Sequence, residues 1–243
     1  MKRKTVTMIA LALFAQTLAL GAARHAQAQD AKNPYPTSMA PLDQYLMDSD
    51  AEIALARSAA PPSIAKDATI MVLGRNGFET AVEGTNGFVC DVDRWMDRFE
   101  NSPEFWNPKR RGPVCYNAQA ARTMMPILLI RTKLALAGKS KAEMDEGMKA
   151  AIEKGQVPAL EPGGMAYMMS KQGFLNSKCG NCGPHLMFYV AVKDAKTWGA
   201  NAAGSPVLLS PHLNGDPEPV TEFDVFVSEW SDGTPADSGD HAH

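Results

Sequence analysis

ATIMVLGRNGFETAVEGTNGFVCDVD, residues 68–93, contains three short apolar runs separated by two Asn-Gly dipeptides. An Asn-Gly pair between apolar runs favours a tight hairpin, because both residues tolerate a positive φ. The segment therefore predicts an antiparallel meander with turns at Asn76-Gly77 and Asn86-Gly87. Its strands are expected over residues 68–73, 78–83 and 88–93.

The third of these strands has two different faces. One face carries Cys90 and Val92, and the opposite face carries Asp91 and Asp93. Such alternation is typical of an antiparallel sheet with one covered face. Asp91, Asp93 and Arg94 are therefore expected on a solvated face, and the alternative is that they form a site.

Two capping-box sequences, one before and one after this segment in the chain, mark the starts of predicted helices. Ser49-x-x-Glu52 predicts a helix over residues 49–60, and Ser140-x-x-Glu143 predicts one over residues 140–154. In a capping box each side chain satisfies a free backbone N–H of the first turn.

Further elements follow from proline placement and from apolar runs. Residues 118–137 are expected to be helical, and Pro126 inside them predicts a kink or two short helices. Three prolines in residues 98–116 indicate a loop. Additional strands are expected over residues 165–170, 186–192, 206–209 and 222–229.

Together these patterns predict a single α+β domain over residues 41–230. Its antiparallel sheet opens with the meander, and the helices between residues 118 and 154 pack on one face. Residues 29–40 are polar and proline-containing and predict a flexible lead-in. Residues 231–243 are acidic and rich in Gly and Ser, which is typical of a disordered tail.

The first 28 residues predict export. A charged start, Lys2 to Lys4, precedes an apolar stretch from Thr5 to Ala23 and the small-x-small sequence Ala26-Gln27-Ala28. This is the pattern of a secretory signal peptide over residues 1–28. The mature chain is then periplasmic or extracellular, and no later segment is long and apolar enough to span a membrane.

The charge balance argues against a nucleic-acid partner. Of 24 basic residues, four precede residue 29, whereas all 27 acidic residues follow it. The mature chain therefore carries 20 basic and 27 acidic residues, a net charge of −7. A mildly acidic chain without a basic stripe is a poor ligand for nucleic acids or anionic membranes.

The densest chemistry lies in Cys179-Gly-Asn-Cys182-Gly-Pro-His185, directly before an apolar strand. Cys179, Cys182 and His185, with His212 as a fourth ligand, are candidates for a Zn or Cu site, because thiolate and imidazole suit these ions. Alternatively, Cys-x-x-Cys cycles between dithiol and disulfide.

Disulfides are the structural alternative for all four cysteines. An exported chain most simply forms two, and the predicted pairs are Cys90–Cys115 and Cys179–Cys182. The first pair would join the proline-rich loop to the meander. The second competes directly with the metal site, because the same sulfurs cannot serve both.

Five further stretches resemble a group of uncharacterised exported bacterial proteins of unknown function. They are ALARSAAP (54–61), GTNGFVC (84–90), FWNP (105–108), AGKSKAEM (137–144) and PHLMF (184–188). Members of this group tend to carry His-x-His-Pro-His before the Leu-Met-Phe strand, which implies a ligand-rich loop there. This chain keeps Pro184-His185 but has Asn181 and Gly183 at the other two positions.

The expected function is binding of a metal or small ligand at the Cys179–His185 loop. A secreted metal-assisted hydrolase or a thiol redox protein is the catalytic alternative, and a structural or partner-binding envelope protein is the third. No Gly-x-Ser-x-Gly, His-Glu-x-x-His or phosphate-binding glycine loop is present. The sequence therefore leaves the reaction, the cofactor and the partner open.

Overall fold

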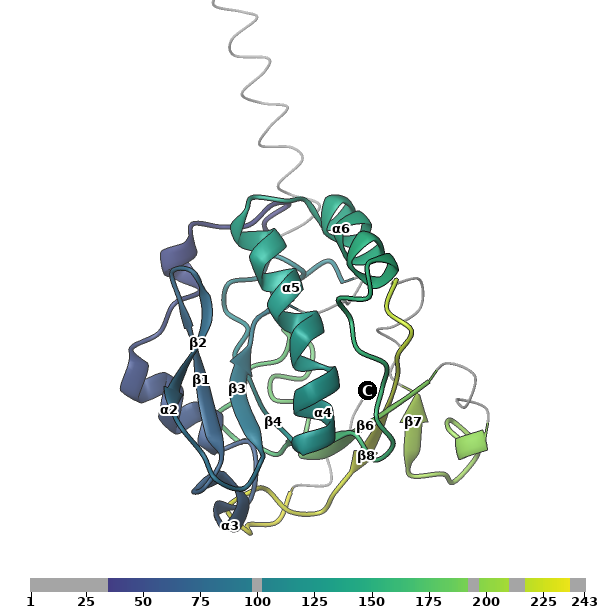
Figure 1. Cartoon of the computed structure of the whole chain (residues 1–243). Coiled ribbons are helices and arrows are strands. Elements are labelled where there is room, and N and C mark those ends of the chain that lie inside the picture. Colours follow the sequence, from purple (N-terminus) through teal and green to yellow (C-terminus); the bar gives the residue numbers. More distant parts are fainter. Residues whose placement is uncertain (1–34, 98–101, 192–196, 210–216, 237–243) are drawn as a thin grey trace, which may run out of the picture. The chain divides into compact units, whose positions relative to one another are not determined.

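A computed structural model of the chain describes residues 35–97, 102–191, 197–209 and 217–236 (Figure 1). The chain divides into two compact units, Met1–Thr37 and Ser38–His243. All helices and strands of the described residues lie in the second unit. The predicted signal peptide, residues 1–28, lies outside the described residues.

One eight-stranded sheet organises the second unit. Its strand order is β2-β1-β3-β4-β5-β6-β8-β7, and every neighbouring pair except β1–β3 is antiparallel. The predicted α+β class is therefore confirmed. The strands are β1 (Thr69–Gly74), β2 (Gly77–Val82), β3 (Val89–Asp93), β4 (Gly112–Tyr116), β5 (Met165–Met168), β6 (His185–Val190), β7 (Val207–Leu209) and β8 (Thr221–Phe226).

The opening meander is only half correct. β1 and β2 form the expected hairpin, in which Gly74 pairs with Gly77 across the turn. β3, however, lies on the other side of β1 and runs parallel to it, with Thr69 opposite Val89. The prediction of a third antiparallel strand beside β2 is therefore wrong.

The connection between β2 and β3 explains this difference. Gly84 crosses so close to the start of β1 that a Cβ there would collide with the backbone of Thr69. The amide of Asn86 then donates to the carbonyl of Asp67, and its Nδ2 donates to the carbonyl of Ile64 at 2.8 Å. Asn86 is thus tied to residues before β1 and does not form a hairpin turn.

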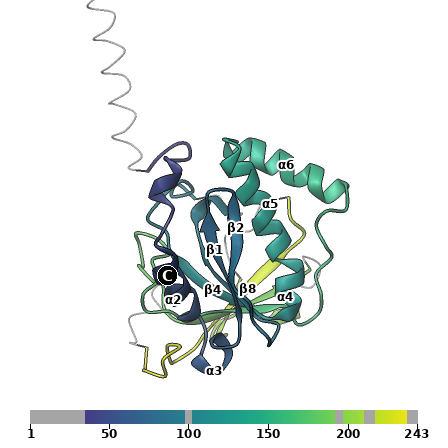
Figure 2. The same cartoon turned by 60° about the vertical axis from the view of Figure 1, so that its left-hand side comes forward.

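Helices cover the sheet on two sides. Figure 2 shows α2 on one side of β1 and β4 and α5 on the other, with α4 below α5. The α-helices are α2 (Ser49–Arg57), α3 (Pro62–Ala65), α4 (Ala118–Thr123), α5 (Met125–Leu136) and α6 (Lys141–Glu153). Two 3₁₀ turns, η1 (Leu42–Gln44) and η2 (Trp95–Asp97), complete the described helical elements.

Of the three local helix signals, two are confirmed by the structure and one is wrong. The capping box of Ser140 and Glu143 is present, and Pro126 lies in the first turn of α5, separating it from α4. The capping box at Ser49 is wrong, because Asp48 caps α2 by accepting from the amide of Ala51. Glu52 is freed by this arrangement and points into the interior.

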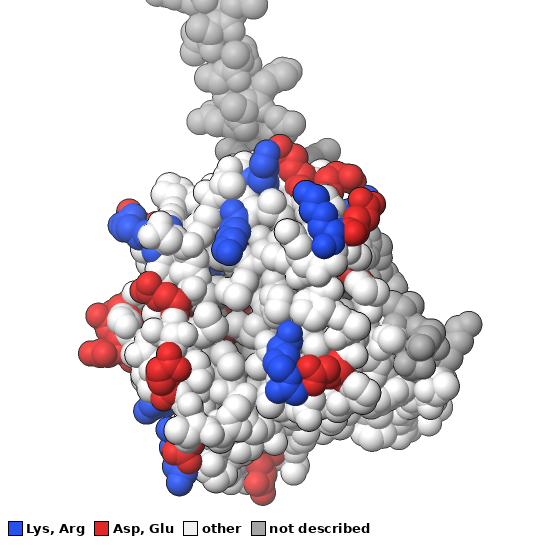
Figure 3. All heavy atoms as spheres, viewed as in Figure 1, with Lys and Arg blue, Asp and Glu red and all other residues white. Residues whose placement is uncertain are grey.

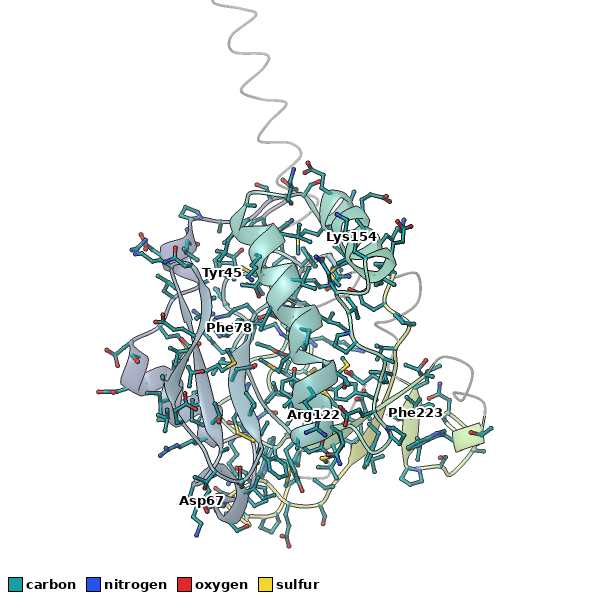
Figure 4. All side chains as sticks on the ribbon, in the orientation of Figure 1. Tyr45, Asp67, Phe78, Arg122, Lys154 and Phe223 are labelled. Atoms are coloured by element: carbon teal, nitrogen blue, oxygen red, sulfur yellow. A yellow bond between two sulfur atoms is a disulfide. The ribbon has the colours of Figure 1, made fainter. Side chains whose placement is uncertain are left out.

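The buried apolar side chains form three clusters. One lies between β4, β5 and β6 and helices α4 and α5, and a second lies between α2 and strands β1, β3 and β4. The third gathers at one end of the sheet and includes Tyr45, with Phe78 packed against it (Figure 4). The site described below lies at the edge of the first cluster.

Two segments predicted as loop or tail are ordered. β4 lies within residues 98–116, where three prolines indicated a loop; its residue Pro113 stands opposite Val92 of β3. Residues 231–236, assigned to a disordered tail, form a turn in which the amide of Trp230 donates to Thr234 and that of Ser231 to Met169. Residues 237–243 lie outside the described residues.

Candidate functional site: a surface disulfide and a buried ionic centre

The loop between β5 and β6 folds back on itself and carries the Cys-x-x-Cys sequence. Gly180 and Asn176 exchange backbone hydrogen bonds across it, and the amide of Leu175 also donates to Gly180, at 2.6 Å. Ser177 donates its amide to the buried carboxylate of Glu104 at 3.0 Å. The loop is therefore held to the core on one side.

Cys179 and Cys182 form a disulfide in this loop, three residues apart. The two cysteine residues differ in exposure, because Cys182 is only 8% exposed whereas Cys179 is partly exposed. Cys182 has a positive φ of 61°, which is uncommon for a residue other than glycine. Cys182 thus belongs to the first core cluster, and the partly buried Cys179 packs against the same cluster from the more exposed side of the ring.

Asn176 contacts both halves of the disulfide. Its Nδ2 donates to the sulfur of Cys182 at 3.4 Å, and its Oδ1 accepts from the amide of Cys179 at 3.0 Å. The same oxygen lies 3.3 Å from the sulfur of Cys179. A hydrogen-bond donor is therefore already aimed at the buried sulfur.

His185 is near this loop in sequence but is turned inward. It begins β6, is 7% exposed, and its Nδ1 donates to the carbonyl of Gly183 at 2.9 Å. Its ring packs against Phe226, with centroids 5.5 Å apart. The imidazole is thus held on the interior face of the strand.

The structure describes three of the four predicted metal ligands, Cys179, Cys182 and His185. Within the described residues, no group of three or more His, Cys, Asp or Glu side chains is arranged to hold an ion. Cys179 and Cys182 are bonded to each other, so neither is a thiolate in this state. His212 lies outside the described residues.

A buried ionic centre, which sequence reasoning placed on a solvated face, lies where β3 ends. Arg94 is fully buried, and its Nη2 donates to Glu52 at 2.9 Å while its Nε donates to the carbonyl of Tyr45 at 2.9 Å. Its Nη1 donates to the carbonyl of Val92, and its amide donates to Asp97 Oδ2 at 2.9 Å. The guanidinium therefore joins α2, η1 and β3.

Asp91 and Asp93 are also buried, each 1% exposed, so the expectation of a solvated face is wrong. The three residues of η2, which come shortly after this strand, are buried as well. Arg110 stacks over the Trp95 ring, 4.3 Å from its centroid. At this depth the carboxylates do not meet a substrate, and we assign the centre to stability.

Two of these carboxyls have shifted pKa values. Burial raises the pKa of Asp91 and of Asp97 well above the ordinary range, and the nearby charge of Asp93 adds to both shifts. Arg94 opposes the shift at both sites. Oδ1 of Asp91 and Oδ1 of Asp97 are buried, and neither has a hydrogen-bond partner within the described part of the chain.

Replacing Asp97 by asparagine is expected to flatten the pH dependence of stability. A carboxyl whose pKa is raised by folding favours the folded state most below its ordinary pKa of about 4, and this contribution is lost as the pH rises through the raised value. Asparagine stays neutral and still accepts from the amide of Arg94. Urea unfolding across that pH window should therefore show a smaller loss for Asp97→Asn.

The control for this measurement is Asp50→Asn, which changes an exposed carboxylate in the first turn of α2. It should leave the slope of unfolding free energy against pH unchanged. An Asp97→Asn slope equal to that of the unmodified protein would contradict the role given to burial.

Figure 3 shows how the charged side chains are distributed on one face of the molecule. Acidic and basic side chains are interspersed there, and the middle of the face is uncharged. An apolar cleft of about 580 Å³ lies against α5, lined by Leu129, Ile130 and Leu134 among others. In the part of the chain that the structure describes, no helix is both long and apolar enough to cross a bilayer.

Fold and site together define an α+β domain with a surface Cys-x-x-Cys disulfide and a second, buried disulfide. No family model matches the chain, and no curated protein or solved structure does. The function must therefore be argued from these residues alone.

Proposed function

We propose that this chain is an exported thiol–disulfide redox protein whose reactive couple is Cys179–Cys182. The observation that carries the proposal is the asymmetry of this disulfide: Cys179 is a partly exposed residue, whereas Cys182 is buried and its sulfur accepts from a hydrogen-bond donor. An incoming thiolate needs access to one sulfur only.

The reaction follows from this geometry. A substrate thiolate attacks Cys179 Sγ, a substrate–Cys179 disulfide forms, the Cys179–Cys182 bond breaks, and its electron pair passes to Cys182 Sγ. The Nδ2–H of Asn176 points at that sulfur and stabilises the leaving thiolate. A second substrate thiol, once deprotonated, displaces Cys179, so the substrate becomes a disulfide and the protein a dithiol.

The second disulfide of the molecule provides an internal contrast. Cys90 and Cys115 are both fully buried, and they face each other in the register of β3 and β4. No sulfur of this pair is open to an incoming thiolate. The two disulfides of one chain therefore separate a reactive role from a structural one.

Export supports the proposal, because disulfides persist in oxidising compartments. Two disulfides in one domain are consistent with the signal peptide predicted over residues 1–28. Zn or Cu binding by Cys179, Cys182, His185 and His212 would require the dithiol state. It is tested separately by metal analysis of the reduced protein.

Mild reduction is expected to open Cys179–Cys182 while Cys90–Cys115 stays intact. Alkylation of the native protein equilibrated in glutathione buffers, followed by peptide mass mapping, would locate the new thiols. For a redox couple we expect a potential in the range of known oxidoreductases, about −120 to −270 mV. A value below about −300 mV, typical of structural disulfides, would overturn the proposal.

Two matched variants identify the attacked sulfur. Cys182→Ser leaves Cys179 accessible and should form a mixed disulfide with a thiol substrate. Cys179→Ser leaves only the buried thiol of Cys182, and its rate of reaction should be lower by about tenfold or more. Asn176→Ala should slow reduction by removing the donor to the leaving sulfur. Equal reactivity of the two single-cysteine variants would contradict the assignment.

A further inference from the structure

Glu104 is a buried carboxylate that faces the loop carrying Cys179 and Cys182. It is 8% exposed and lies between η2 and β4, directly before FWNP (105–108). Its Oε1 accepts from the amide of Ser177 at 3.0 Å, and its Oε2 accepts from Ser177 Oγ at 3.4 Å. Both carboxylate oxygens therefore hold a residue that stands two positions before Cys179.

Hydrogen bonds, rather than a cation, stabilise this carboxylate. Among the residues that the structure describes, Glu104 accepts from Asn107 Nδ2 at 2.8 Å and from Ser177, and it takes part in no salt bridge. A buried carboxylate is costly unless its oxygens receive hydrogen bonds, and hydrogen bonds to a charged acceptor are stronger than those between neutral groups. Ser177 is consequently fixed to the core by a strong contact.

The segment that carries Glu104 is itself fixed in the core. Phe105 and Trp106 are each 5% exposed and belong to the third core cluster. Tyr45 Oη donates to the carbonyl of Trp106 at 2.8 Å, and the amide of Asn107 donates to the carbonyl of Glu104 at 2.7 Å. Glu104 is therefore presented to the loop from a rigid support.

The same segment also holds the base of the loop. Arg111 and Phe174 exchange backbone hydrogen bonds at 2.9 and 2.8 Å. The buried Arg110 donates through its Nη1 to the carbonyl of Leu175 at 3.0 Å. Residues 104–111 therefore contact the loop at its base and again just before its first cysteine.

Asn176 links the position of Ser177 to the disulfide. It directly precedes Ser177 in the chain, its Nδ2 donates to Cys182 Sγ at 3.4 Å, and its Oδ1 accepts from the amide of Cys179 at 3.0 Å. Because Asn176 and Ser177 share one planar peptide unit, holding the amide of Ser177 also fixes the orientation of the backbone at Asn176. Glu104 thus acts on the donor that points at Cys182 Sγ.

We propose that Glu104 is a positioning residue that raises the reduction potential of the Cys179–Cys182 couple by holding Asn176 in place, an inference that rests on the proposed redox function. A hydrogen bond to a thiolate is stronger than one to the sulfur of a disulfide, so a fixed donor favours the reduced state. A direct effect of charge would have the opposite sign, because a carboxylate disfavours a thiolate near it. Position and charge therefore predict different results.

Glu104→Asp and Glu104→Gln separate position from charge. Aspartate keeps the charge but is one methylene shorter, so its oxygens no longer reach the amide of Ser177. Glutamine keeps the length and one acceptor oxygen but is neutral. In glutathione buffers, Glu104→Asp should lower the equilibrium constant for reduction of Cys179–Cys182 about tenfold, which corresponds to a potential about 30 mV more negative. Glu104→Gln should change it less.

The pH dependence of alkylation gives a second readout that a loss of stability would not move. Adding Glu104→Asp to Cys179→Ser should raise the pKa of the Cys182 thiol, because its thiolate loses a fixed donor. Glu218→Ala is the matched control, since it removes a buried carboxylate that binds Arg131 at 2.7 Å. It should lower stability and leave the potential unchanged.

An unchanged potential for Glu104→Asp, or a larger change for Glu104→Gln than for Glu104→Asp, would overturn the positioning role. A potential of the unmodified protein in the range of structural disulfides would instead reject the redox function. The two failures are distinct, because the positioning role is tested by the difference between variants and not by the absolute potential.

Discussion

Replacing Arg94 by methionine is expected to lower the free energy of unfolding by about 3–5 kcal/mol. Methionine approximates the apolar part of the side chain but removes every donor of the guanidinium. Glu52 is then left buried, and among the described residues the amide of Leu73, at 3.2 Å, is its remaining hydrogen-bond donor. The carbonyl of Tyr45 also loses the hydrogen bond donated by Arg94.

A double-mutant cycle in urea would show that the loss comes from the unpaired carboxylate. Combining Arg94→Met with Glu52→Leu should recover part of the stability, since breaking a buried pair costs more than replacing both partners by apolar groups. Arg75→Met is the control, because its pair with Asp43 is exposed, and little or no change is expected. A loss below about 1 kcal/mol for Arg94→Met would contradict this role.

Removing the buried disulfide is the second large effect. The chain-entropy model gives about 3.5 kcal/mol for Cys90–Cys115, which are 25 residues apart. The paired variant Cys90→Ala with Cys115→Ala should therefore unfold at clearly lower urea concentration. Both sulfurs also belong to the cluster beneath α2, so some packing is lost as well.

The matched comparison is Cys179→Ala with Cys182→Ala. Their ring closes only three residues, and the same model gives about 1.5 kcal/mol. Urea unfolding of both double variants should rank the two disulfides in this order. An equal or larger loss at Cys179–Cys182 would assign that pair to stability and weaken the redox proposal.

Local signals predicted most elements because each depends on a few adjacent residues. Ser140 and Glu143 lie within one turn, so their capping box needs no distant partner. Pro126 excludes an uninterrupted helix because it lacks a backbone N–H and because its ring clashes with the preceding turn of a helix. The apolar runs that became β5, β6 and β8 were recognised on the same basis.

Predictions from short sequence patterns were wrong where one residue of the pattern interacts with a residue far away in the sequence. Ser49-x-x-Glu52 matches a capping box, yet Glu52 pairs with Arg94, which is 42 residues away in sequence. Asn86-Gly87 matches a hairpin turn, yet Asn86 is tied to Ile64. Each short pattern is compatible with two arrangements, and in both cases the folded chain uses a hydrogen bond to a residue that is distant in sequence.

The candidate site, too, could be predicted from the sequence only in part. The spacing of Cys179 and Cys182 allowed either a metal ligand pair or a short disulfide ring, and proximity of the sulfurs alone did not choose between them. The structure pairs them and leaves Cys179 more exposed than Cys182. Exposure depends on what the whole fold places over a residue, so sequence spacing does not report it.

By itself, the sequence determined the α+β class and most helices and strands, because periodicity and turn residues act over short distances. For Cys179 and Cys182 it left a disulfide and a metal site open. Tertiary structure alone decided the parallel placement of β3 and the burial of Asp91, Asp93 and Arg94. These depend on which segments, far apart in the chain, exclude water from one another, and no local pattern encodes that choice.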